Sequence, residues 1–140
     1  MNKNLGEQLT GVMPPETAIA NMRTLVAECD RLKSAQSAEG VCRGSRDIWN
    51  AFEEQLVFGN PDRMLRAKAK KASQLLGRGV RAIEAVLASA KLSPVERERL
   101  PHYAAAVQKR MEDLEVLAEE GPAALNARLY REFFKITKNF

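Results

Sequence analysis

Residues 61–91 read PDRMLRAKAKKASQLLGRGVRAIEAVLASAK and carry the most regular apolar pattern in the chain. The apolar residues keep one phase at about 100° per residue, the period of an amphipathic α-helix. They are Leu65, Ala69, Ala72, Leu76, Val80, Ile83, Leu87 and Ala90. Because the phase continues across Gly77 and Gly79, we expect one long helix over residues 61–91, although each glycine costs roughly 1 kcal/mol relative to alanine. Asn60 and Pro61 supply its start, and two shorter helices are the alternative.

The sequence before residue 60 predicts two further helices separated by a loop. From Pro15 to about Lys33, apolar residues recur every three or four positions, as on one face of a helix. The serines and glycines of residues 34–44 then indicate a loop. Ser45 can cap a second helix that ends at Gly59. Residues 1–14 are expected to be flexible or loosely packed.

Three more helices are predicted after the long one. Ser93 and Glu96 form a capping box with proline in the first turn, but this helix is expected to end at Leu100 because Pro101 follows. The next covers residues 101–120 and places its acids, Asp113 among them, on the face opposite its apolar residues. Gly121 and Pro122 separate it from a C-terminal helix.

The fold class that these patterns predict is all-α. The chain shows no sustained alternation of apolar and polar residues and no Asn-Gly or Asp-Gly hairpin turn. Its 140 residues are enough for one hydrophobic core without disulfides or metals. We therefore predict a compact bundle of five or six helices in a single domain of residues 1–140, built around the long helix of residues 61–91.

Composition and local patterns set the expected compartment. Hydrophobic residues make up 45% of the chain and charged residues 29%, too apolar a balance for a disordered protein. No apolar run approaches the roughly 20 residues that span a bilayer, and the N-terminus lacks the pattern of a signal peptide. We expect a cytoplasmic protein with no membrane partner. Cys29 and Cys42 are accordingly predicted to be free thiols.

Positive charge is concentrated in the long helix. Residues 61–81 hold seven cations and one acid, a net +6, while the other 15 cations and 17 acids make −2. Lys and Arg release condensed counterions when they meet phosphates, so we predict a non-enzymatic protein that contacts a nucleic-acid backbone, DNA or RNA, or a nucleoprotein complex. The predicted contact residues are Arg63, Arg66, Lys70, Lys71, Arg78 and Arg81. A solvated face, partly paired with the acids of residues 101–120, is the alternative interpretation.

The C-terminal helix predicts a second function. Its inward stripe is expected to contain Leu125, Leu129, Phe133 and Ile136. Tyr130 and Phe134 point away from this stripe beside Arg131, and exposed aromatics next to arginine resemble interface anchors. The alternative function is therefore a protein-binding adaptor, regulator or inhibitor that acts through these three residues, with a homodimer as one form. A helix buried on both sides is the structural alternative.

Patterns for catalysis and metal binding are missing from the sequence. His102 is the only histidine, and no serine or cysteine lies in a nucleophile motif. Cys29 and Cys42 are too few and too far apart to complete a zinc site of Cys and His ligands. Residues 77–79 lack the Gly-Lys-Ser/Thr ending of a phosphate-binding loop. We expect no enzymatic activity, no metal and no cofactor.

Overall fold

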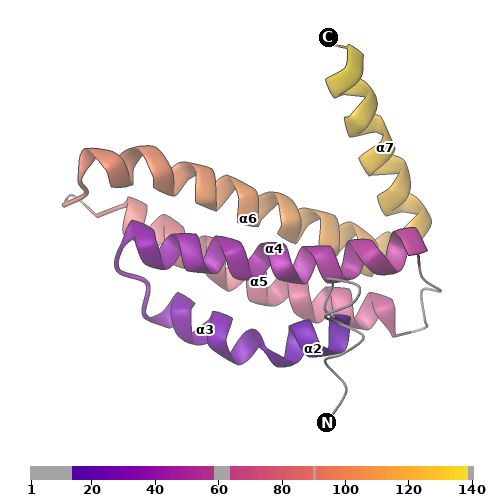
Figure 1. Cartoon of the computed structure of the whole chain (residues 1–140), viewed down its shortest axis with the longest axis horizontal. Coiled ribbons are helices and arrows are strands. Elements are labelled where there is room, and N and C mark those ends of the chain that lie inside the picture. Colours follow the sequence, from indigo (N-terminus) through magenta and orange to yellow (C-terminus); the bar gives the residue numbers. More distant parts are fainter. Residues whose placement is uncertain (1–13, 59–63, 90, 139–140) are drawn as a thin grey trace.

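The computed structural model describes residues 14–58, 64–89 and 91–138. In that part of the chain every regular element is a helix, which confirms the all-α prediction. The helices are α2 (Pro15–Ala20), α3 (Met22–Asp30), α4 (Ala35–Phe58), α5 (Leu65–Leu87), α6 (Pro94–Glu120) and α7 (Pro122–Lys138) (Figure 1). The expected N-terminal segment up to residue 13 and the expected helix start at Asn60 and Pro61 lie outside the described residues.

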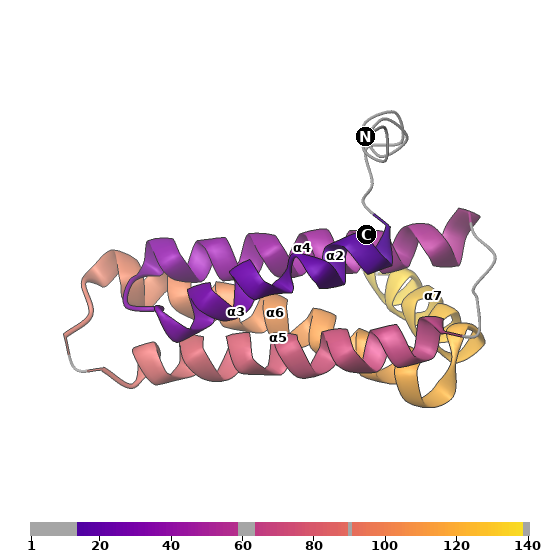
Figure 2. The ribbon, with the colours of Figure 1, turned by 90° about the horizontal axis from the view of Figure 1, so that it is seen from below.

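The helices α4, α5 and α6 run side by side and form the body of an elongated bundle (Figures 1 and 2). The predicted first helix is divided at Asn21 into α2 and α3, which pack together against α4 and α5. The last helix, α7, packs mainly on α6 and turns away from the long axis of the bundle (Figure 1). The arrangement therefore gives a three-helix body, a bent arm along one side and a projecting helix at one end.

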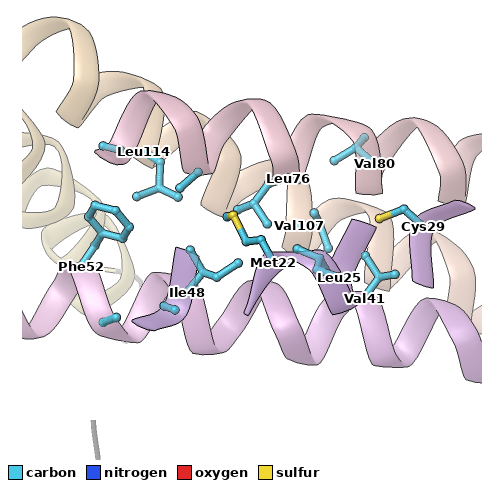
Figure 3. Close-up of a cluster of buried hydrophobic side chains, with 14 of the residues drawn as sticks. Met22, Leu25, Cys29, Val41, Ile48, Phe52, Leu76, Val80, Val107 and Leu114 are labelled. Atoms are coloured by element: carbon cyan, nitrogen blue, oxygen red, sulfur yellow. The ribbon is translucent and has the colours of Figure 1, made fainter. Parts of the chain in front are cut away.

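The core lies between the three long helices and the inner side of α2 and α3. The apolar phase predicted for α5 is buried from Leu65 through Ile83, and the helix is continuous across both glycines, as expected. Figure 3 shows Phe52 and Ile48 of α4 pointing toward Leu76 of α5 and Leu114 of α6. The side chains of Phe52, Leu76 and Leu114 are fully buried. Burying each such side chain contributes about 1.5–3 kcal/mol, so this layer supplies much of the stability of the bundle.

The predicted loop of residues 34–44 is wrong, because α4 runs through most of it. Ala38 and Val41 within this segment are fully buried in the core. The glycines that suggested a loop instead permit close helix packing: a Cβ added at Gly44 would lie 3.0 Å from Leu25 Cδ1 of α3. Tertiary packing thus outweighs the low helix propensity of glycine at this position.

The predicted helix end at Leu100 is also wrong. The capping box forms as expected, with Ser93 Oγ accepting from the Glu96 backbone N–H at 3.2 Å, but α6 continues through Pro101 to residue 120. A proline inside a helix costs about 3 kcal/mol, because it removes one backbone hydrogen bond and crowds the preceding turn. Leu100 and Val107 are fully buried on either side, and their burial offsets that cost.

Among the glycines of the described residues, Gly79 of α5 leaves the least room for a side chain. A Cβ added there would lie 2.9 Å from Val41 Cγ1, 3.5 Å from Cys29 Sγ and 3.8 Å from Val107 Cγ1, so α3, α4 and α6 all converge on this glycine. Gly77 differs, because its Cβ would meet only the flexible ends of Met111 and Arg81, at 3.4 and 3.5 Å. Glycine is required at position 79 because a larger side chain would overlap Val41, and not because of the backbone conformation.

We predict opposite stability effects for two alanine substitutions on this helix. Gly79→Ala should lower the free energy of unfolding by about 1–3 kcal/mol, because the new methyl group overlaps Val41. Gly77→Ala should leave it unchanged or raise it by up to about 1 kcal/mol, because alanine is the better helix former and its neighbours can move. Urea unfolding of both variants checks this. Equal stabilisation by the two substitutions would contradict the packing argument.

Candidate functional site

The described cations of the predicted phosphate-binding face all lie on the exposed side of α5. Arg63 is outside the described residues. Among the residues that the structure describes, Lys70, Lys71 and Arg81 make no hydrogen bond or ion pair through their side chains. Lys70 and Arg81 are eleven residues apart, about 16 Å along the helix at 1.5 Å per residue. These three residues, which we call the free cations, are the part of the face open to a phosphate.

Arg66 joins α5 to α6 through two hydrogen bonds. Its Nε donates to the backbone carbonyl of Ala118 at 3.0 Å, and its Nη2 donates to the carbonyl of Glu119. Both carbonyls lie in the last turn of α6, where helix carbonyls lack partners within the helix. A cation at a helix C-terminus is also favoured by the helix dipole. Arg66 therefore caps α6 from a neighbouring helix.

Arg78 and Lys68 tie α5 to the N-terminal arm. Arg78 Nη2 lies 2.8 Å from Asp30 Oδ1 at the end of α3, and Lys68 pairs with Glu16 of α2. Both pairs are partly open to solvent, so each contributes only about 0–1 kcal/mol. The paired cations of the described α5 thus contact α2, α3 and the backbone of α6, rather than the acids of residues 101–120.

The aromatic residues of α7 form an exposed cluster. Tyr130 is 64% exposed, Phe133 60% and Phe134 52%. The rings of Tyr130 and Phe134 meet edge to face, with centroids 4.8 Å apart and planes at 72°, and Phe133 and Phe134 lie 6.3 Å apart at 78°. We call these three residues the aromatic surface. The predicted interface anchors Tyr130 and Phe134 are therefore exposed, and Arg131 beside them is exposed too.

The predicted inward position of Phe133 is wrong. Leu125 is fully buried and Leu129 is half-buried against the core, so the first turns of α7 follow the expected stripe. Farther along, α7 has turned away from the bundle (Figure 1), and the side chain of Phe133 is exposed. Ile136, the other residue expected to point inward, lies outside the described side chains.

A polar network attaches α7 to α6. The side chain of Asp113 is only 5% exposed, accepting from Arg128 Nε at 3.0 Å through Oδ1 and from Lys109 Nζ at 2.5 Å through Oδ2. Glu132 completes the network, 2.9 Å from Lys109 and 3.5 Å from Arg128. We call Lys109, Asp113, Arg128 and Glu132 the α6–α7 clasp. All four charges are paired, and for Asp113 the pairing offsets the cost of burying a carboxylate.

The clasp also changes the titration of Lys109. Burial alone would lower the pKa of the Lys109 ammonium, but hydrogen bonds to Asp113 and Glu132 outweigh it and raise the pKa above its ordinary 10.5. A raised pKa in the folded state stabilises the fold fully below pH 10.5, and this contribution is lost as the pH rises through the higher value. Lys109 is therefore charged throughout the neutral range.

Sequence reasoning missed the role of Asp113, which was expected on the exposed acidic face. The sequence nevertheless contains a pattern of charges that indicates this role. Lys109 with Asp113 and Arg128 with Glu132 are pairs of opposite charge spaced by four residues, on the two helices that flank Gly121. Gly121 has a φ of 94°, a left-handed conformation suited to glycine, and it lets α7 start immediately after α6. That sharp turn brings the two charge pairs together.

The two cysteines belong to the packed part of the bundle. Both cysteines are free. Burial raises the pKa of the Cys29 thiol, which keeps it protonated and unreactive at neutral pH. Cys42 is half-buried, and Arg110 Nη1 donates to its carbonyl oxygen at 3.0 Å and to Ser45 Oγ at 2.9 Å. This contact joins α4 to α6 and serves the packing of the bundle.

Comparisons of the chain with protein-family models, with curated proteins and with solved structures give no match. In the part of the chain that the structure describes, acidic, histidine and cysteine side chains do not gather into a group of three or more that could hold a metal. Within the same residues, no helix combines the length and the apolar character needed to cross a bilayer. The aromatic surface and the free cations are the two candidate binding surfaces of the described chain.

We predict that Asp113→Ala releases α7 from α6. The substitution removes the buried one of the two carboxylates that Arg128 and Lys109 share and leaves them Glu132, which should lower the free energy of unfolding by about 1–3 kcal/mol. Amide exchange in α7 should speed up while exchange in the buried part of α5 changes little, and hydrogen–deuterium exchange by mass spectrometry measures both. Glu115→Ala, an exposed acid on the same helix, is the control. Unchanged exchange in α7 would show that the clasp does not hold it.

Proposed function

We propose that this chain is a non-enzymatic binding protein, an adaptor or regulator, that contacts a protein partner through the aromatic surface of α7. The observation that carries the proposal is the exposure of three neighbouring aromatic side chains, each more than half accessible. Leaving such side chains in water forgoes about 1.5–3 kcal/mol of burial each. Contiguous exposed apolar patches mark interaction sites, and tyrosine is enriched among the residues that dominate binding energy.

The rigidity of the aromatic surface supports the same proposal. The α6–α7 clasp attaches the helix through hydrogen-bonded charges, and Leu125 anchors its first turn in the core. The edge-to-face contacts among the three rings restrict their rotamers before any partner arrives. A preorganised surface loses less conformational entropy on binding, so more of the contact energy appears as affinity.

Contact with a nucleic-acid backbone or a nucleoprotein complex is the second candidate function. It is supported by the free cations Lys70, Lys71 and Arg81, which lie exposed on one helix. It ranks below protein binding because Arg66 and Arg78 bind groups of the chain itself. A phosphate would have to displace these contacts to use the whole predicted face.

We predict that the double substitution Tyr130→Ala and Phe134→Ala abolishes partner binding without unfolding the protein. Exposed substitutions usually change stability by about 0.5 kcal/mol or less, whereas loss of two interface anchors costs 2 kcal/mol or more each in typical cases, roughly a 30-fold loss of affinity per residue. Affinity capture from an extract of the source organism, quantified by mass spectrometry against wild type, measures the loss, and urea unfolding measures stability.

The matched control for this experiment is the pair Met64→Ala and Val95→Ala. Both residues are large, apolar and exposed, at 58% and 53%, but neither belongs to α7. Proteins captured by wild type and by the control variant, but not by the Tyr130/Phe134 variant, are the expected result. A stability loss of several kcal/mol in the Tyr130/Phe134 variant would instead assign the two rings to the core.

For the second candidate, we predict that replacing Lys70, Lys71 and Arg81 by glutamate removes any affinity for nucleic acid while the fold survives. Three lost phosphate contacts should also lower the salt dependence, reducing the slope of log K against log salt by about 3 for duplex DNA. Fluorescence anisotropy with a labelled DNA duplex and a labelled RNA strand at two salt concentrations measures this. A wild-type protein without affinity for either at low salt would exclude the second candidate.

A further inference from the structure

The spacing of the aromatic surface indicates how a partner would be engaged. Tyr130, Phe133 and Phe134 stand at positions i, i+3 and i+4 of α7, so they share one face of the helix. This spacing is typical of an amphipathic helix that lays its apolar face into a hydrophobic groove. The complementary surface is therefore an apolar groove that accommodates three rings along about one turn of helix.

The charges beside the aromatic surface indicate what borders that groove. Arg131 and Lys135 are exposed and, being four residues apart, lie along the same edge of α7. Glu132, the only acid in residues 121–140, is held in the α6–α7 clasp by Lys109 and Arg128. The described part of α7 thus presents cations and no free acid next to its aromatic rings. A partner of complementary potential carries carboxylates on the facing rim.

The same charges argue against two other occupants. Two copies of α7 packed antiparallel through their aromatic surfaces would bring the edge with Arg131 and Lys135 beside the same edge of the other copy, and like charges brought together are costly. A helix that lies on an anionic membrane needs its polar face in water. In this chain part of that face is turned to α6, because Arg128 and Glu132 belong to the clasp.

We propose, building on the protein-binding function proposed above, that the partner is a protein with an apolar groove bordered on one rim by acidic side chains. The groove takes Tyr130, Phe133 and Phe134, and the acidic rim faces Arg131 and Lys135. The rings supply the burial that determines how slowly the complex dissociates. The two cations set the orientation of α7 in the groove and speed association.

The test uses phage-displayed protein fragments from the genome of the source organism as the probe. The full-length protein is the bait, and fragments that also bind the Tyr130→Ala/Phe134→Ala variant are discarded. For the fragments that remain, affinity is measured for wild type, for Arg131→Glu/Lys135→Glu and for the control Arg46→Glu/Arg99→Glu. The control changes net charge equally at exposed sites on α4 and α6.

We expect the Arg131/Lys135 reversal to weaken binding about tenfold or more, with a smaller effect at high salt, and the control to change it little. Replacing the rim carboxylates of the fragment by lysine should restore binding to the reversed variant. If fragments require the aromatic rings but bind the Arg131/Lys135 variant as tightly as wild type, the acidic rim is wrong. The proposed protein-binding function would still hold.

Three further results would rule out a protein partner or replace it by a second copy of the chain or by a membrane. If no fragment depends on Tyr130 and Phe134, the protein-binding function itself fails. A dimer in sedimentation equilibrium that the Tyr130→Ala/Phe134→Ala variant loses would replace the acidic-rimmed partner by a second copy. Binding to phosphatidylserine vesicles that requires the same two rings would replace it by a membrane.

Discussion

The close approach of four helices at Gly79 is the constraint on which the rest of the bundle depends. With only a hydrogen atom there, α5 can lie against Val41 of α4, Cys29 of α3 and Val107 of α6 at once. A methyl group would lie 2.9 Å from Val41 Cγ1 and push α4 away, and close-packed interiors have little room to absorb that shift. This glycine therefore sets how closely α4 approaches α5, while α6 packs along both helices and carries α7 at its end.

Much of the positive charge of α5 secures this arrangement. Arg66 caps the C-terminal end of α6, and Arg78 joins the end of α3. A sequence cluster of cations can therefore hold helices together instead of presenting a continuous surface to a ligand. The three cations left free lie on the outer side of the helix, which reduces the predicted phosphate-binding face to Lys70, Lys71 and Arg81.

Two sides of α7 have different roles: the clasp attaches the helix to α6, and the aromatic surface is open to solvent. Hydrogen-bonded charged groups, of which Asp113 is buried and the others are partly exposed, hold one side of the helix to α6, while the rings on another side are more than half exposed. Leu125 of the same helix is fully buried, as is usual for an apolar side chain, so the exposure of the three rings stands out. It is the physical basis for assigning the projecting helix, rather than the basic face, as the principal binding surface in our proposal.

The sequence by itself determined the features that depend only on residues three or four positions apart within one helix. The all-α class, the continuous phase of α5 and the capping box at Ser93 are of this kind, as is the placement of Tyr130 and Phe134 on one face. Tertiary structure alone decided the helix through Gly44, the continuation past Pro101, the cap formed by Arg66 and the exposure of Phe133. Each of these depends on a partner from a distant part of the chain, or on the direction in which α7 turns from the bundle, and no local spacing encodes it.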